Sequence, residues 1–66
     1  MKFGERLNYL RNEKKMSALK LSEVLNVSHS TIIRWEKGEI LPSIEHLYNI
    51  ATYFGVSADY LIGLED

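Results

Sequence analysis

One short stretch of the chain carries side chains that suit contact with nucleic acid. After Ser28, the positions expected to be exposed on a helix hold His29, Ser30, Ile33, Arg34 and Lys37. These side chains are hydrogen-bonding groups, cations or carriers of methyl groups, and none is acidic. DNA base edges present hydrogen-bonding atoms and the thymine methyl group. The stretch therefore suits a nucleic-acid groove, with an ordinary solvated helix as the alternative.

The elements that would position this stretch are two helices joined by a tight turn. Leu21 and Leu25 lie four residues apart and predict one apolar stripe on the first helix. Asn26 falls where the chain must turn, and Asn tolerates left-handed backbone better than any residue except Gly. Ser28 is then a favourable N-cap for the second helix. The pattern predicts a helix, a turn and a helix within residues 17–37.

Apolar spacing and cap residues predict five helices in all. Their expected ranges are about 2–13, 18–25, 29–37, 44–54 and 58–62, with Ser17, Ser43 and Ser57 as further N-caps. On the fourth helix, the residues expected to face inward are Ile44, Leu47, Ile50, Ala51 and Phe54. Connections of about four residues or fewer suit a compact all-α bundle, and residues 1–66 form a single domain.

Charge is distributed unevenly along the chain, whose formal net charge is −1. Residues 1–37 hold all eight basic residues and four acidic ones, which gives +4, whereas residues 38–66 hold five acidic residues and no Lys or Arg, which gives −5. The asymmetry predicts a cationic binding half and an acidic remainder. The chain has no Cys and no apolar run of about 20 residues, so we expect a soluble, cytoplasmic protein without disulfides or a membrane span.

Short motifs follow one another in order from Phe3 to Gly63. They include Phe3-Gly4-Glu5-Arg6-Leu7, Val27-Ser28, Thr31-Ile32, Arg34-Trp35-Glu36-Lys37-Gly38, Leu41-Pro42-Ser43, Gly55-Val56-Ser57 and Asp59-Tyr60-Leu61-Ile62-Gly63. In this order and spacing they resemble the Xre/Cro-type helix-turn-helix family of phage and bacterial transcriptional repressors. The resemblance implies a five-helix, lambda repressor-like domain. It also implies a transcriptional regulator, most simply a repressor, that reads a palindromic operator on double-stranded DNA as a homodimer.

Members of that family use the start of the motif's second helix to reach base edges in the major groove. The resemblance therefore implies base contacts from His29 and Ser30, and Arg34 could hold a guanine or reach a phosphate. Ile33 stands where relatives often carry a polar residue. It either packs on a thymine methyl group or is an exposed apolar residue that makes no contact with DNA. Contacts to the DNA backbone are expected from Ser17, Ala18, Lys20, Ser28, Thr31, Lys37, Lys14 and Arg11.

Three further positions depart from the family pattern. Ala18 replaces a Gln that touches a phosphate in relatives, so only backbone N–H groups remain for that contact. Glu39 occupies a loop that often carries basic residues. Ser22 stands at a buried position and needs a hydrogen-bond partner, for which a carbonyl one turn back is expected. Trp35 and Glu36 are predicted to be structural, as a core aromatic and a helix brace.

A second copy of the chain is expected to bind at the C-terminal end, away from the cationic half. The predicted interface consists of Tyr60, Ile62, Leu64 and Val56, with Leu41 and Ile44 as neighbours that could join it. Leu19 and Val24 form a competing apolar patch, and a third interpretation is that the C-terminal residues cap the monomer's own core.

No enzymatic activity, metal site, cofactor or small-molecule ligand is predicted. His29 and His46 fall on different helices and have no Cys to complete a metal site, and no Gly-rich phosphate loop is present. The alternative functions are a protein-interaction module or an antitoxin-like domain that binds a partner protein on the same fold. The salt dependence of binding to duplex DNA would distinguish them, because an interaction module would not bind DNA at any salt concentration.

Overall fold

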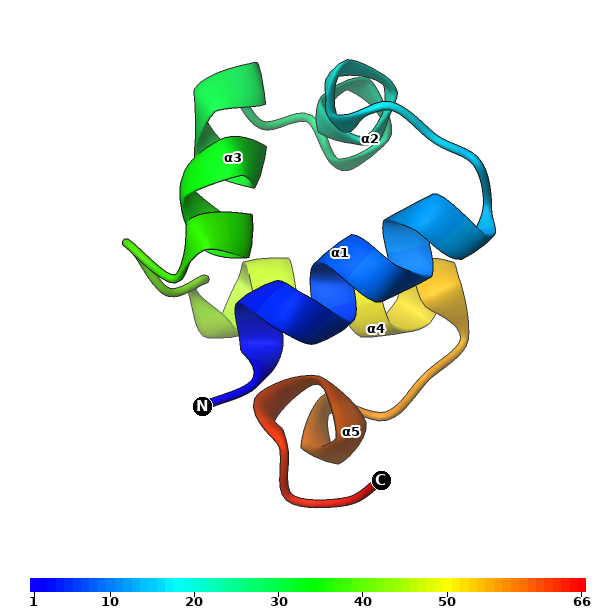
Figure 1. Ribbon diagram of the computed structural model, residues 1–66, viewed down its shortest axis with the longest axis vertical. Helices are drawn as coiled ribbons and strands as arrows, with labels where there is room; N and C mark the ends of the chain where they lie inside the picture. Colours follow the sequence, from blue (N-terminus) through cyan, green and yellow to red (C-terminus); the bar gives the residue numbers. More distant parts are fainter.

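The computed structural model describes all 66 residues and contains five helices and no strands. The helices are α1 (Phe3–Glu13), α2 (Ala18–Leu25), α3 (His29–Lys37), α4 (Ile44–Phe54) and α5 (Ala58–Ile62) (Figure 1). The all-α class and the five predicted helices are confirmed, and each boundary lies within about one residue of its expected position.

Serine side chains begin four of the five helices. The Oγ atoms of Ser17, Ser28, Ser43 and Ser57 each accept a hydrogen bond from the backbone N–H three residues further on. Such a cap satisfies one of the N–H groups that have no partner inside the helix. The same four helices end at residues with left-handed backbone conformation, which are Asn26, Gly38, Gly55 and Gly63. The sharp turn at Asn26, with φ of 57°, sets the angle between α2 and α3.

All five helices contribute to one apolar core. Its fully buried members are Phe3, Leu7, Leu21, Ile32, Trp35, Ile50 and Leu61. Trp35 packs edge-on against Phe3, with ring centroids 6.0 Å apart, which confirms its predicted structural role. Ser22 is also buried, and its hydroxyl donates a 2.6 Å hydrogen bond to the carbonyl of Leu19, as the sequence predicted.

The predicted burial of one residue, Ile44, is wrong. Ile44 does not face inward, since 86% of it is exposed to solvent. It is the first residue of α4, where no other helix packs over it, so its place on the apolar stripe does not bury it. Tyr48 lies one turn further along α4 and is also exposed, at 68%. The start of α4 thus presents apolar surface on the outside of the molecule.

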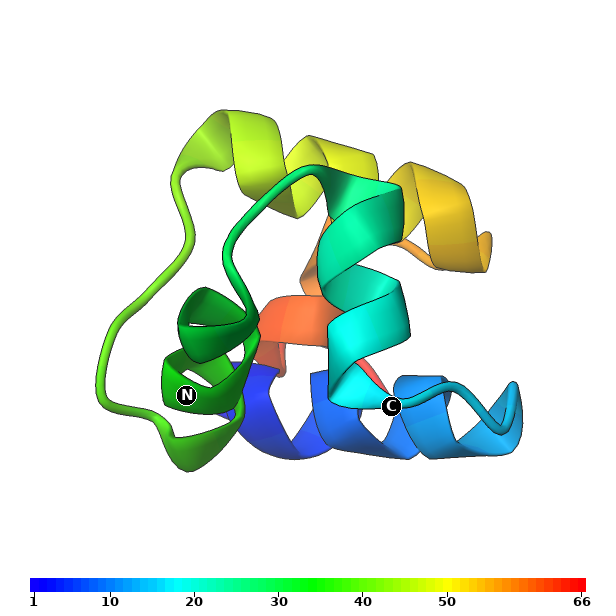
Figure 2. The same cartoon turned by 90° about the horizontal axis from the view of Figure 1, so that it is seen from above.

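The motif formed by α2 and α3 occupies one end of the molecule, and α5 occupies the other (Figure 1). Helices α1 and α4 overlap in that view, but the view from above places them on opposite sides (Figure 2). Both termini lie at the α5 end. The stretch that suits nucleic acid is therefore carried at one end of the bundle, with α1 packed along one side of α3.

Candidate nucleic-acid interface

The first turn of α3 presents a group of polar side chains to solvent. Besides capping the helix, Ser28 places its Oγ 2.7 Å from Thr31 Oγ1 and 3.1 Å from Ser30 Oγ. Both Ser30 and its neighbour His29 are exposed. These hydroxyl and imidazole groups can each donate or accept hydrogen bonds, which is what base edges and phosphates require.

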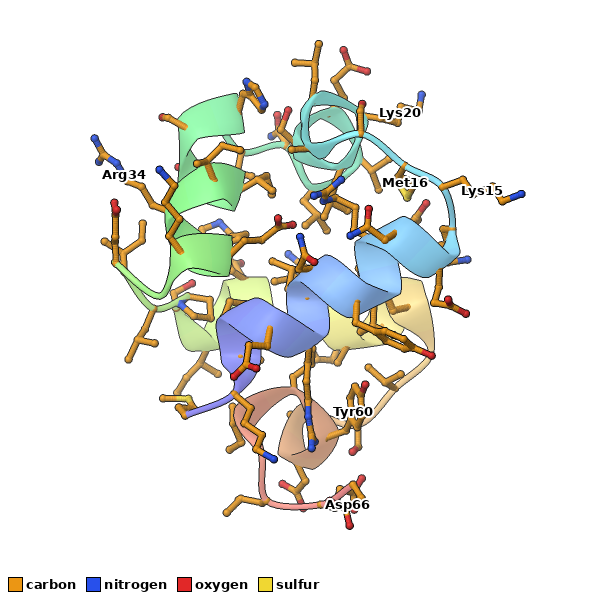
Figure 3. All side chains as sticks on the ribbon, in the orientation of Figure 1. Lys15, Met16, Lys20, Arg34, Tyr60 and Asp66 are labelled. Atoms are coloured by element: carbon orange, nitrogen blue, oxygen red, sulfur yellow. The ribbon has the colours of Figure 1, made fainter.

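Two free cations continue this surface along α3. Arg34 is exposed and points away from the body of the molecule (Figure 3), and Lys37 is exposed one turn beyond it. Neither side chain forms an ion pair. Ile33 differs because it is half-buried, so only part of its side chain is open to a ligand. Four of the five residues named on α3 are thus exposed.

A second group of cations lies around the start of α2. Lys20 and Lys15 extend outward there (Figure 3), and Lys14 places its Nζ atom 5.5 Å from the centre of the Tyr53 ring. Ser17 caps the helix through a 3.0 Å hydrogen bond from the N–H of Lys20. Ala18 is half-buried against the core, and its methyl side chain can make no polar contact, so only its backbone N–H could reach a phosphate.

Arg11 is engaged inside the protein, through contacts that the sequence did not indicate. Its Nε and Nη2 atoms hold the Glu36 carboxylate at 2.7 and 3.0 Å, and its Nη1 atom donates to the carbonyl of Met16 at 2.8 Å. The hydrogen bond to Glu36, and then the Glu36 charge, raise the pKa of Arg11 above its ordinary value against the opposing effect of burial. Arg11 braces the turn before α2 and the end of α3, so its side chain is not free here for the phosphate contact that the sequence suggested. Glu36 is a helix brace, as predicted.

Two further residues at the junction of α1 and α3 were missed from the sequence. Asn8 donates a 2.9 Å hydrogen bond from Nδ2 to Glu36 Oε1. At Gly4, a Cβ atom would lie 2.6 Å from the carbonyl oxygen of Trp35 and 2.7 Å from that of Glu36. Gly4 therefore permits the close approach of the two helices. Gly4 belongs to the family pattern, but a single sequence contains no sign of either contact.

The four residues predicted as a dimer interface do not form one exposed patch. Arg6 covers the ring of Tyr60, with its guanidinium carbon 4.4 Å from the ring centre, and donates a 2.6 Å hydrogen bond to the Tyr60 carbonyl. Ile62 is half-buried, whereas Leu64 is exposed on the tail that follows α5. Only Val56 lines a larger apolar feature.

That feature is a shallow groove of about 540 Å³ along α4 and the start of α5. We call it the α4–α5 groove; its apolar lining is Ile44, Leu47, Tyr48, Ala51, Val56 and Ala58. None of its lining residues is charged, and none belongs to α2 or α3.

None of the five helices has the length and apolar character that a membrane span requires. No three His, Cys, Asp or Glu side chains are grouped so that they could hold a metal ion.

Comparison with known proteins places the chain among regulators of transcription. A helix-turn-helix family model matches residues 7–61. The whole chain is 38% identical to part of the transcriptional activator BcrR of Enterococcus faecalis, and 98% of it is 29% identical to part of the immunity repressor of Bacillus phage phi105. It spans 32% and 45% of the lengths of these two curated relatives.

A solved structure gives the same result for the fold. The crystal structure of a transcriptional regulator from Listeria innocua superposes with a TM-score of 0.89 at 38% identity, over 97% of this chain and 60% of that one. The arrangement of α2 and α3, the capped turn between them and the match over residues 7–61 agree with one another. The chain belongs to the Xre/Cro-type helix-turn-helix family of DNA-binding transcriptional regulators.

Proposed function

We propose that this domain binds double-stranded DNA sequence-specifically, with α3 in the major groove, and regulates transcription as a repressor at a palindromic operator. The observation that carries the proposal is the exposed surface of α3. It presents His29, Ser30, Arg34 and Lys37 without an acidic residue, in a protein whose overall charge is negative. A surface of this kind faces a polyanion favourably and offers the groups that read base edges.

The residues divide into base-reading and phosphate-binding groups. His29, Ser30 and Arg34 read base edges, Arg34 most favourably as a bidentate partner of guanine, and the exposed part of Ile33 packs on a thymine methyl group. Phosphates are held by hydroxyls and cations of α3, of the start of α2 and of the turn before it. These are Ser17, Ser28, Thr31, Lys14, Lys20 and Lys37, together with the backbone N–H of Ala18.

A homodimer completes the proposal. One domain of this size covers a single half-site, and two recognition helices must lie about 34 Å apart to reach successive major grooves. We propose that a second copy packs on the α4–α5 groove, because its lining carries no charge to repel an identical partner and leaves α2 and α3 free. Of the interface residues predicted from the sequence, Val56 lines this groove and is retained. Tyr60 does not line it, and Arg6 covers its ring.

The exposed groove also supports a second candidate function, a protein-interaction domain that does not bind DNA. The two functions differ in their response to salt. For a DNA-binding domain, the logarithm of the affinity falls linearly with the logarithm of the salt concentration, with a slope of about −0.9 for each neutralised phosphate. Absence of binding to mixed duplexes at low salt would favour the interaction domain.

The direct test of base reading is Arg34→Ala, with Lys37→Ala as its control. On an operator selected from random duplexes, Arg34→Ala should lose about 1–3 kcal/mol of discrimination at one base pair. Lys37→Ala should weaken binding to all sequences alike, because a phosphate contact carries no base identity. Fluorescence anisotropy titrations of operator and scrambled duplexes measure both. An unchanged ratio of specific to non-specific affinity in Arg34→Ala would show that Arg34 does not read a base.

A further inference from the structure

Three hydrogen-bond donors meet on the carboxylate of Glu36. Arg11 supplies two of them, and Asn8 Nδ2 supplies the third, to Oε1 at 2.9 Å. The side chains of Glu36 and Arg11 are only 10% and 14% exposed, so this carboxylate lies in the seam between α1 and α3. Figure 1 shows the two helices side by side there. Asn8 and Arg11 are three residues apart on α1 and hence lie on the same face of the helix.

The Asn8 amide is held in the orientation that this contact needs. Asn12 Nδ2 donates to Asn8 Oδ1 at 3.1 Å and to the Asn8 carbonyl at 2.9 Å. Because the amide oxygen is engaged on that side, the amide nitrogen is directed at Glu36, which can only accept. The hydrogen bonds thus run from Asn12 through Asn8 to Glu36 on the inner side of α3.

We propose that Asn8 is a positioning residue for base recognition, which acts through Glu36. The proposal rests on the DNA-binding function proposed above. If a single residue of α1 held the Glu36 carboxylate, α3 could rotate about that contact. Because both Asn8 and Arg11 hold it, the rotation of α3 relative to α1 is fixed. Glu36 lies two residues after Arg34 on α3, so a rotation at Glu36 moves Arg34 as well. Base contacts require side chains held to about 0.5 Å, while attraction to phosphates requires only charge.

The test separates positioning from folding by using two alanine variants of the same helix. Asn8→Ala removes the third donor, and Asn12→Ala removes the outer amide but leaves the Asn8–Glu36 hydrogen bond possible. Neither changes the charge, and both favour the helix, since Ala has the higher propensity. Asn8→Ala should lower affinity for the selected operator by about tenfold while affinity for a scrambled duplex changes by less than about twofold. Asn12→Ala frees the Asn8 amide but keeps the third donor, so it should lower affinity for the operator by less than Asn8→Ala does and leave affinity for the scrambled duplex unchanged.

A swapped pair provides the rescue. Asn8→Asp places a second carboxylate against Glu36 and should reduce the specificity ratio more than Asn8→Ala does. Adding Glu36→Gln to Asn8→Asp restores a donor and an acceptor in reversed order at the wild-type net charge, but it removes the Arg11 Nη2 hydrogen bond to that position, so it should recover part of the ratio. Circular dichroism at the titration temperature verifies that each variant is folded.

The outcomes are distinct. A specificity ratio that Asn8→Ala leaves at the wild-type value, or equal losses for operator and scrambled duplex, would overturn the positioning role. Wild-type protein that binds no duplex at low salt would instead remove the proposed DNA-binding function and this inference with it.

Discussion

Gly4 is a residue whose importance comes from its neighbours in space. Gly inside a helix normally costs about 0.5–1 kcal/mol relative to Ala, and Gly4 lies within α1. Here the absence of a side chain allows the backbone of α1 to approach the carbonyl groups of Trp35 and Glu36. The contact sets the distance across which Asn8 and Arg11 reach Glu36.

We expect Gly4→Ala to destabilise the fold by about 1–3 kcal/mol, despite the better helix propensity of Ala. The added methyl group would meet backbone oxygens at 2.6 and 2.7 Å, and backbone cannot rotate away as a side chain can. Thermal unfolding followed by circular dichroism measures the loss. Asn12→Ala, on the exposed side of α1, is the control and should lose less stability than Gly4→Ala, since its amide bonds only to Asn8 at the surface. A Gly4→Ala protein as stable as its control would show that the helices adjust at no cost.

Single residues also mark the limit of sequence-based prediction. The exposed groups on α3 could be placed because helix period and cap position determine them. The roles of Arg11 and Asn8 could not, because both depend on Glu36, which lies more than 20 residues away in sequence. Ile44 shows the same limit, since its burial depends on whether another helix covers the end of α4.

At the level of elements, helix boundaries were the most predictable feature. Each capping Ser bonds to a backbone N–H three residues away, so the signal lies within a few residues of the boundary. Asn26 at the turn between α2 and α3 was predicted for the same reason. Lys15, at the turn between α1 and α2, has a φ of 56° that was not predicted, because Lys has no preference for left-handed backbone.

The turn at Asn26 yields a prediction about stability. Asn26→Ala should cost about 1 kcal/mol, since a Cβ without a compensating polar group is strained at this φ. Asn26→Gly should remain within about 0.5 kcal/mol of wild type, because Gly adopts the same backbone freely. Urea unfolding of both variants provides the comparison. Equal stability of the Ala and Gly variants would mean that backbone strain at Asn26 is not what holds the turn.

At the scale of the whole molecule, the distribution of charge and of apolar surface separates two ends. Exposed cations lie on α3, at the start of α2 and in the turn before it, although Lys2 lies beside Gly63 at the α5 end. The α4–α5 groove is lined by the half of the chain that has no Lys or Arg. The sequence predicted this division of charge. It misplaced the apolar surface, because the exposure of Ile44 and Tyr48 follows from packing rather than from residue type.

We expect Ile44→Glu and Tyr48→Glu to yield monomers at concentrations where the wild type is dimeric. A charge buried in an apolar interface without a partner is strongly unfavourable, and both residues are open to solvent in the single chain, so folding should survive. Leu19→Glu, at a similarly exposed site on α2, is the control. Analytical ultracentrifugation at several concentrations gives the masses. If Leu19→Glu alone yields monomers, the second copy packs on α2 instead.

Trp35 is the only tryptophan in the chain, and it is 2% exposed although it belongs to the recognition helix. Its ring faces the core, 5.3 Å from the His46 ring, while the surface proposed to meet DNA lies on the other side of α3. Tryptophan fluorescence, excited at a wavelength that Tyr does not absorb, therefore reports on the interior alone. Unfolding exposes the indole to water and shifts its emission to the red, whereas a duplex bound to the outer face leaves the emission maximum in place. A single emission spectrum thus distinguishes an unfolded variant from a folded variant that has lost only DNA binding.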